Sequence, residues 1–203
     1  MLTFLGYTLV FLAMLVSLYL VIRPEASSRS FLRTAAMGTQ SSPFLLLSLS
    51  FIFEATSLDL VSSYVGEGLP LFYRISAVWG SRSGPLLMWA SMMSVIAWLM
   101  SKDETTDSTT IRVLHFWTLL LLLISAGLRP FSPAVPGSAG EISPLLQTDL
   151  MVIHPPVVFV YYSLCLATAS VAVSGLIRSR PSNEIHASIC LLYTSDAADD
   201  LRC

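Results

Sequence analysis

Hydrophobic positions along the chain fall into five long runs, separated by connections that are polar or rich in glycine and proline. The runs cover about residues 2–22, 43–61, 85–100, 111–128 and 155–177. A helix that crosses the hydrocarbon core of a bilayer needs roughly 20 mostly apolar residues, and each run meets or approaches that length. The pattern therefore predicts an all-α fold, a polytopic transmembrane helix bundle of about five spanning helices. The first run has no basic segment before it and no small-residue cleavage site, so we expect a spanning helix and not a cleaved signal peptide.

The basic residues predict the orientation of this bundle, because cytoplasmic loops carry an excess of lysine and arginine. Seven of them lie in connections on one side of the predicted membrane: Arg23, Arg29, Arg33, Lys102, Arg112, Arg178 and Arg180. Three lie on the other side: Arg74, Arg82 and Arg129. This asymmetry predicts that the N-terminus is outside, together with the connections at 62–84 and 129–156.

The two connections predicted outside are longer than the inner ones and partly apolar. Residues 62–84 form an amphipathic segment with aromatic side chains at Phe72, Tyr73 and Trp79, which is typical of a stretch that lies along the membrane interface. Residues 129–156 are rich in proline and glycine, so they cannot form one long helix. Long connections are commonly functional, and we therefore expect any chemistry on the outer side.

Composition supports a membrane protein and excludes several other classes. The 203 residues are 54% hydrophobic and 12% charged, about half of the 25% or so that is usual in soluble domains. A net charge of −2 argues against a nucleic-acid partner, which would need a basic face. Cys165, Cys190 and Cys203 form no CxxC and no metal-ligand spacing, so neither a disulfide framework nor covalent haem attachment to this chain is indicated. Cys165 lies within an apolar run and is expected to pack as a small hydrophobic residue.

His154 is the residue best placed for chemistry, because it ends the second outer connection and is followed directly by Pro155 and Pro156. Proline is tolerated in the first turn of a helix, so we expect His154 at or next to the N-cap of the last spanning helix. There the positive end of the helix dipole disfavours an imidazolium, and a neutral ring keeps the lone pair that binds a metal or haem iron. The alternative is a histidine that only caps the helix or lies at the interface. His115, expected at the inner interface, and His186, in the polar tail, receive no role.

Other candidates have weaker signals. Glu54 interrupts an apolar run, but it lies near the outer end with Asp59 close by, which favours a structural or water-exposed role over a proton relay. Three methionines with partial helical spacing are expected to pack and not to bind haem: Met88, Met92 and Met93. Isolated tryptophans such as Trp79 and Trp89 are typical of the interfacial belt. The outer arginines suit lipid headgroups and anionic groups such as haem propionates equally well.

Two long motifs combine several of these residues. The run LPLFYRISAVWGSRSGPLLMW is followed, after a spanning segment, by SPLLQTDLMVIHPPVVFVYY. They resemble the outer loops LPxxYRxxxxWGxxxGSxxLW and NPLLQDPxxxxHPPLLYxGY of the haem-lyase subunit family of cytochrome c maturation (CcmF, its nitrite-reductase relative NrfE and the related CcsA proteins). The matching positions include Leu69, Pro70, Tyr73, Arg74, Trp79, Gly80, Gly84, Trp89, Pro144, Leu145, Leu146, Gln147, His154, Pro155, Pro156 and Tyr161. The chain departs from the family at Ser143, Pro85 and the pair Thr148-Asp149.

The resemblance implies a role in cytochrome c-type biogenesis, in which haem is presented on the outer face of the bacterial, archaeal or organellar inner membrane. The reaction forms thioether bonds between haem vinyl groups and the cysteines of an apocytochrome CxxCH. It implies that His154 is one of two axial ligands to haem b. Trp79, Gly80, Gly84 and Trp89 would shape the loop beneath the haem, with Arg74 as a weaker member. The implied partners are a haem chaperone, other maturation subunits and apocytochrome c. Both the general and the nitrite-reductase branches share these motifs.

The resemblance covers about residues 1–180, which we interpret as the N-terminal part of a haem-lyase-like domain. We interpret residues 181–203 as a polar tail, and from about residue 190 the sequence resembles translated sequencing-adapter DNA. The Trp-rich haem-binding loop and the second outer ligand of the family are not in this sequence, so we expect half a haem site without autonomous activity. Two other classes remain open, a transporter or channel subunit with internal repeats and paired broken helices, and a structural membrane subunit whose outer loops bind a partner.

Overall fold

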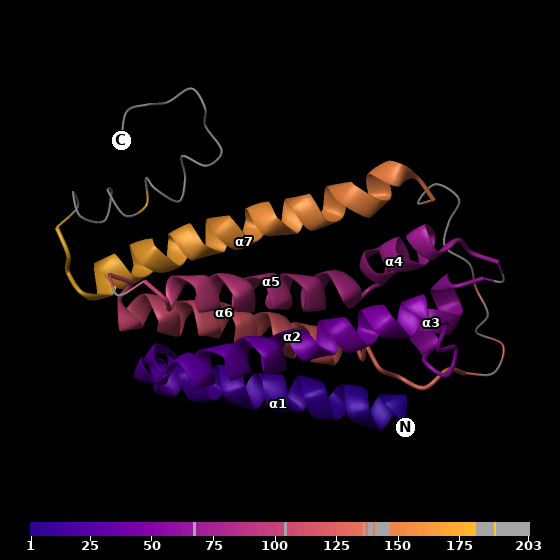
Figure 1. Ribbon diagram of the computed structural model, residues 1–203, viewed down its shortest axis with the longest axis horizontal. Helices are drawn as coiled ribbons and strands as arrows, with labels where there is room; N and C mark the ends of the chain where they lie inside the picture. Colours follow the sequence, from indigo (N-terminus) through magenta and orange to yellow (C-terminus); the bar gives the residue numbers. More distant parts are fainter. Residues whose placement is uncertain are drawn as a thin grey trace.

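The computed structural model describes residues 1–66, 68–103, 105–135, 137, 140, 147–181 and 189. Across them the chain forms seven α-helices and one short 3₁₀ helix, η1 (Figure 1). In chain order the elements are α1 (Leu2–Ile22), η1 (Pro24–Ser28), α2 (Ser30–Ile52), α3 (Asp59–Tyr64), α4 (Leu71–Gly80), α5 (Gly84–Met100), α6 (Ser108–Gly127) and α7 (Asp149–Ile177). The described part of the chain contains no strand, and the predicted all-α fold is confirmed.

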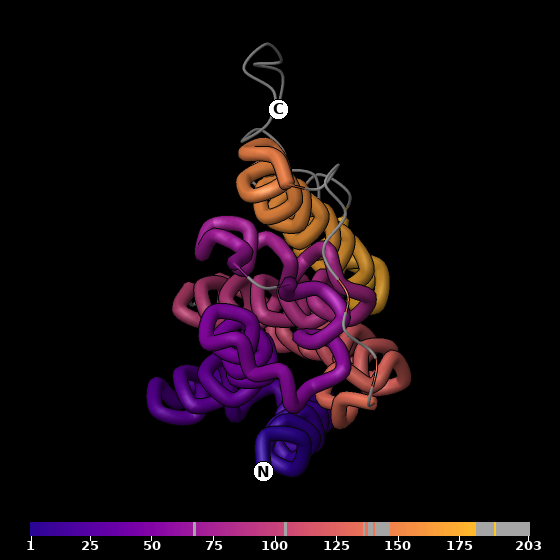
Figure 2. Tube along the Cα trace, turned by 90° about the vertical axis from the view of Figure 1, so that its right-hand side faces the viewer, coloured from indigo at the N-terminus to yellow at the C-terminus, as the bar shows by residue number. Residues whose placement is uncertain are grey.

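Five long helices lie side by side along the long axis of the molecule, whereas α3 and α4 gather at the end where the chain begins (Figure 1). The helix α5 packs against α2, α6 and α7, and α1 packs against α2 and α6. The view along the bundle places α7 on the side opposite α1 (Figure 2). The centre of the bundle is therefore α5, and α7 is a peripheral helix.

Three helices, α1, α6 and α7, are long and apolar enough to cross a membrane. The helices α4 and α5 pass the same test together although an 88° bend separates them, and they make a fourth span if the bent pair crosses as one. The molecule is thus a helical membrane bundle, with up to four apolar spans among the described residues where about five were predicted.

The prediction for the second span is wrong in its bounds, because α2 covers Ser30–Ile52 and not 43–61. The first half of α2 is rich in hydroxyl and amide side chains, some of which bond to carbonyl groups of their own helix. Thr39 Oγ1, for example, donates to the Ala35 carbonyl at 2.8 Å. The helix ends just before Glu54, whose φ of 51° is left-handed. Because the first half of α2 is polar, the hydropathy pattern did not show where this helix begins. For the same reason α2 is not among the helices apolar enough to count as spans.

The predicted start of the last span is also wrong, because α7 begins at Asp149 and not at Pro155. Thr148 is the N-cap, and its side chain accepts a hydrogen bond from the Met151 N–H. The helix then continues through Pro155 and Pro156, which lie in its second turn. A proline inside a helix breaks it most readily where nothing replaces the lost backbone hydrogen bond. Here a residue of another helix supplies a donor.

The segment after α6 packs at the end of the bundle that carries α3 and α4. The Asp59 N–H donates to the Ser132 carbonyl at 2.9 Å, which ties the segment after α6 to the start of α3. Phe131, in the same segment, is fully buried against Gly6 of α1. A Cβ at Gly6 would lie 2.2 Å from the Phe131 ring, so α1 needs glycine at this contact.

The opposite end of the bundle is closed by a polar contact between α6 and α7. Asp107, the N-cap of α6, accepts a hydrogen bond from Ser174 Oγ at 2.6 Å and pairs with Arg178. The Asp107 side chain is only 4% exposed, so this pair is shielded from solvent on one side. It fixes the end of α7 to α6.

We expect Gly6→Ala to lower the free energy of unfolding by about 1–3 kcal/mol, because the added methyl group overpacks the contact with Phe131. Gly38→Ala is the matched control, since nothing lies within 4 Å of a Cβ there and the exchange adds up to about 1 kcal/mol of helix propensity. Equilibrium unfolding of both variants in detergent measures the difference. Equal stability of the two variants would contradict the packing described for Phe131.

Candidate functional site

The first motif of the sequence forms a sharp corner between α4 and α5. Ser81 Oγ donates to the Val78 carbonyl at 2.6 Å and accepts a hydrogen bond from the Gly84 N–H at 3.1 Å. A Cβ at Gly84 would lie 1.7 Å from the Val78 carbonyl oxygen. Only glycine allows the start of α5 to approach the end of α4 this closely, which explains the 88° bend. Gly80 is the last residue of α4.

Trp79, at the end of α4, joins this corner to α7. In an α-helix each N–H bonds to the carbonyl four residues earlier, so Pro155 leaves the Met151 carbonyl without its usual donor. The indole Nε1–H of Trp79 donates to that carbonyl oxygen at 2.7 Å. The two sequence motifs therefore meet through one hydrogen bond between a side chain of the first and the backbone of the second.

Trp89, on α5, makes a second contact with α7. Its ring centroid lies 5.8 Å from that of Phe159 and 5.8 Å from that of Tyr162. Phe159 and Tyr162 also pack edge to face, at 6.0 Å. Both motif tryptophans thus pack against α7 and do not act as isolated belt aromatics.

His154 lies in the second turn of α7, and its side chain is exposed. The prediction that it lies at the N-cap is wrong, because Thr148 holds that position. The field of a helix dipole acts mainly in the first turn, so the dipole argument made for an N-cap histidine does not apply at this depth.

The surroundings of His154 are apolar and open. Four large hydrophobic residues with helical spacing share its exposed face: Leu150, Ile153, Val157 and Tyr161. The buried face of α7 carries small residues: Ser163, Ala167, Ser170, Ser174 and Gly175. The imidazole therefore stands in an exposed apolar stripe that points away from the bundle.

Arg74 is held within the protein. Its Nη2 pairs with Glu54 Oε1 at 2.8 Å, its Nε donates to the Leu69 carbonyl at 2.7 Å, and its Nη1 reaches the Ile52 carbonyl at 3.4 Å. These bonds tie α4 to the last turn of α2. Arg74 thus supports the position of α4, and Glu54 lies at the bend after α2 as a partly exposed partner of this arginine.

The remaining candidates separate from this site. His115 is buried, with its Nδ1 3.1 Å from Gln40 Nε2, so its expected place at the membrane interface is wrong. Cys165 is exposed on α7 and does not pack inside the bundle as expected. Among the described residues no three His, Cys, Asp or Glu side chains gather as a metal site. Several predictions lie outside the described residues: those for His186, the tail from 182 and the motif residues at 143–146.

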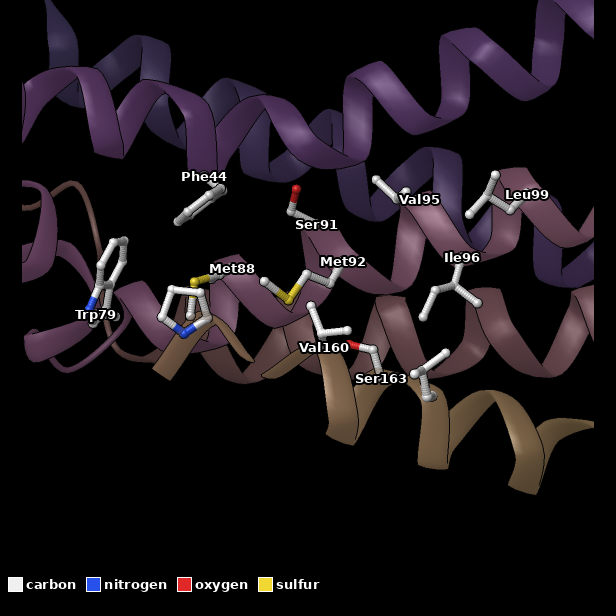
Figure 3. Close-up of a pocket in the computed structure, with 12 residues that line it drawn as sticks. Phe44, Trp79, Met88, Ser91, Met92, Val95, Ile96, Leu99, Val160 and Ser163 are labelled. Atoms are coloured by element: carbon white, nitrogen blue, oxygen red, sulfur yellow. The ribbon is translucent and has the colours of Figure 1, made fainter. Parts of the chain in front are cut away.

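An apolar groove of about 570 Å³ runs along α5 between α2 and α7 (Figure 3). Phe44, Met88, Met92, Pro156 and Val160 line it, and Trp79 stands at one end. Met88 and Met93 are buried and pack as predicted, whereas Met92 is half-buried and lines the groove. The lining is mostly apolar, with Ser91 and Ser163 as its two hydroxyl side chains. His154 is two residues, or about 200° of helix rotation, from Pro156, so it lies on the far side of α7 from the groove.

Comparison with known proteins identifies relatives for most of the chain. The sequence model of the family described as "Cytochrome C assembly protein" matches residues 79–197. The chain is 29% identical over 167 residues to the cytochrome c-type biogenesis protein CcmF of Escherichia coli, which covers 78% of this chain and 26% of that protein. It is 27% identical over 189 residues to CcmF of Haemophilus influenzae, covering 83% of this chain and 29% of the relative.

A relative from the other branch matches similarly. NrfE of Haemophilus influenzae is 25% identical over 155 residues, which covers 71% of this chain and 24% of NrfE. The chain therefore spans about a quarter of the length of the curated relatives that it matches. No solved structure matches the chain significantly.

Three participants in the site were not predicted from the sequence: the Met151 carbonyl and the rings of Phe159 and Tyr162. The carbonyl could have been found, because a proline inside a helix always leaves the acceptor four residues earlier without a donor. The two rings are three residues apart, so they share one helix face, but nothing in the sequence shows that this face meets Trp89.

We expect Trp89→Ala to weaken the packing of the N-terminal half of α7, because it removes the ring that packs on Phe159 and Tyr162. Loss of a large, partly buried aromatic side chain costs about 2–3 kcal/mol. Amide hydrogen exchange should accelerate in α7 and remain unchanged in α1. Trp98→Ala is the control, since Trp98 bonds to Thr34 on α2 at 3.2 Å, and an equal effect of both variants on α7 would contradict the assignment.

Proposed function

The chain belongs to the cytochrome C assembly protein family, and from this premise we propose that it takes part in cytochrome c biogenesis as the N-terminal part of a haem-lyase subunit. In this proposal His154 supplies one axial ligand to haem b. The observation that carries it is an exposed imidazole on an apolar helix face, in a turn whose Met151 carbonyl accepts a hydrogen bond from Trp79.

The residues around His154 suit one face of a haem. A haem is a flat, largely apolar plate with two axial positions on its iron, and an unprotonated imidazole nitrogen fills one of them. Ile153 and Val157 flank His154 on the exposed face and offer apolar contact to the plate. Arg74 pairs with Glu54 at 2.8 Å, whereas Arg82 lies 3.9 Å from Asp59 and its side chain is 70% exposed, so Arg82 is the better suited of the two to meet a propionate.

The second axial ligand is proposed to come from the part of the family's length that this chain does not span. A haem whose iron was held between His154 and that second ligand could be presented to an apocytochrome, where the S–H of each CxxCH cysteine would add across one vinyl group to form a thioether bond. His154 holds the iron from one side in this scheme. A haem chaperone and other maturation subunits are the proposed partners.

We further propose that the end carrying α3 and α4 faces the outside of the inner membrane. The structure supports this through the position of the basic residues, since Arg74, Arg82 and Arg129 lie at the end that also carries His154 and the N-terminus (Figure 1). The seven other basic residues used for the orientation flank the opposite ends of the helices. The two sides thus differ as the positive-inside rule requires.

A transporter or channel subunit is not favoured by any observation. That class predicts broken helices in pairs, and the described residues contain a single bent pair, α4 with α5. The bend has a local cause in the approach of Gly84 to Val78.

We expect the chain in lipid nanodiscs to bind haem weakly, and added imidazole to convert the bound haem to a six-coordinate low-spin form by filling the second axial position. His154→Ala should weaken haem binding at least about tenfold in the presence of imidazole. Haem titration followed by absorbance measures both. Ile153→Ala is the control, because it alters the apolar face and leaves the imidazole.

Two results would count against the ligand assignment. Unchanged binding by the His154→Ala variant would show that the iron is held elsewhere. A tight six-coordinate spectrum of the unmodified chain without imidazole would show that this chain holds both ligands itself, and that the half-site description is wrong.

The orientation has its own test. Alkaline phosphatase fused at position 154 should be active, because this enzyme requires the periplasm. Green fluorescent protein fused at the same position should not fluoresce, because it would be exported. Fusions after Lys102 should show the reverse pattern. A cytoplasmic position 154 would contradict the proposed haem presentation on the outer face.

A further inference from the structure

We propose that Trp79 is a positioning residue for His154: its indole N–H replaces the amide proton that Pro155 lacks and so fixes the turn of α7 that carries the histidine. This inference rests on the proposed function of His154 as a ligand. It gives Trp79, from the first motif, a role in supporting the backbone of another helix, separate from any contact of its ring with haem.

The proline pair creates a weak point in α7. Pro155 and Pro156 have no N–H, so the carbonyl groups of Met151 and Val152 lack the donors that join one helical turn to the next. The turn from Asp149 to His154 is therefore connected to the rest of the helix by fewer hydrogen bonds than any other turn. Without an external donor, this turn could pivot at the prolines.

Trp79 supplies the external donor from a rigid base. Its Nε1 lies 2.7 Å from the Met151 oxygen, a short distance for an N–H···O bond. The corner that carries Trp79 is held by the bonds of Ser81 to Val78 and Gly84. The Trp79 ring, at one end of the groove (Figure 3), also shares the groove's lining with Pro156, so the side chain is near the proline pair as well as bonded to the turn before it.

Fixing Met151 fixes His154, because the two residues belong to the same turn. An imidazole on a pivoting turn would lose orientational freedom when it binds iron, whereas one on a fixed turn has already lost it. The hydrogen bond from Trp79 to the Met151 carbonyl, called the clamp below, should therefore raise the affinity for haem and narrow the range of iron–imidazole geometries.

The test uses a double-mutant cycle in the whole chain in nanodiscs, with haem and imidazole as the probe. Trp79→Phe keeps an aromatic ring and removes the N–H, and we expect haem binding to weaken about tenfold. Pro155→Ala gives the Met151 carbonyl a donor within the helix. In that background Trp79→Phe should change haem binding less than about twofold.

Pro156→Ala is the matched control, because its new N–H serves the Val152 carbonyl and leaves Met151 dependent on Trp79. In that background Trp79→Phe should again weaken haem binding about tenfold. A merely structural tryptophan would have the same effect in all three backgrounds. Equal effects would overturn the inference.

Amide hydrogen exchange at Ile153 and His154 separates this inference from the proposed function. Trp79→Phe should accelerate exchange at both positions in the presence of Pro155, and not in the Pro155→Ala background, whether or not haem binds. If the cycle appears in hydrogen exchange but no variant binds haem, the clamp stands and the proposed function fails. If haem binds through His154 but exchange shows no such dependence on Pro155, the clamp is refuted alone.

Discussion

A helix that runs through two adjacent prolines leaves carbonyl groups without donors, and near a membrane such groups have to find partners within the protein. In this chain the partner of one of them is the indole of Trp79. The donor can reach it because Gly84 lets α5 turn sharply away from α4. The turn that carries His154 is thus bonded to a corner formed much earlier in the chain, and this bond links the two motifs in space.

Polar side chains inside the bundle form hydrogen bonds of two kinds, within one helix and between helices, and the difference bears on how the helices are held together. Hydroxyl groups such as those of Ser163 and Thr118 bond to carbonyls of their own helix, so these residues act as small side chains that allow close packing. Gln40 instead bridges Ser17 on α1 at 2.8 Å and His115 on α6 at 3.1 Å. The least apolar long helix, α2, is therefore held in the bundle by polar contacts as well as by apolar area.

How much could be predicted follows from whether a feature is decided locally. The bounds of α1, α5 and α6 agree with the sequence pattern within three residues, because apolar runs with polar flanks suffice to define them. The continuation of α7 through its proline pair and the burial of His115 involve groups from other helices, Trp79 in the first case and Gln40 in the second. A pattern along the chain does not show which groups of other helices lie nearby. Without a donor nearby, the same proline pair would break the helix. The motif resemblance named both tryptophans, but it did not show that Trp79 and Trp89 both contact α7.

The position of α7 reconciles weak packing with a defined site. A peripheral helix with a whole exposed face would be expected to move, yet α7 is held at one end by Asp107 with Arg178 and at the other by Trp79. Its buried face consists of small residues, so few side chains are needed to seat it between α5 and α6. The opposite face then remains open, with one imidazole among large apolar side chains. A helix fixed at both ends and open along one side can present a ligand to a flat apolar cofactor, whose other side is left to a second segment of polypeptide. The aligned part of this chain covers only 24–29% of the length of these relatives, so in the proposed function that second segment would come from the remainder.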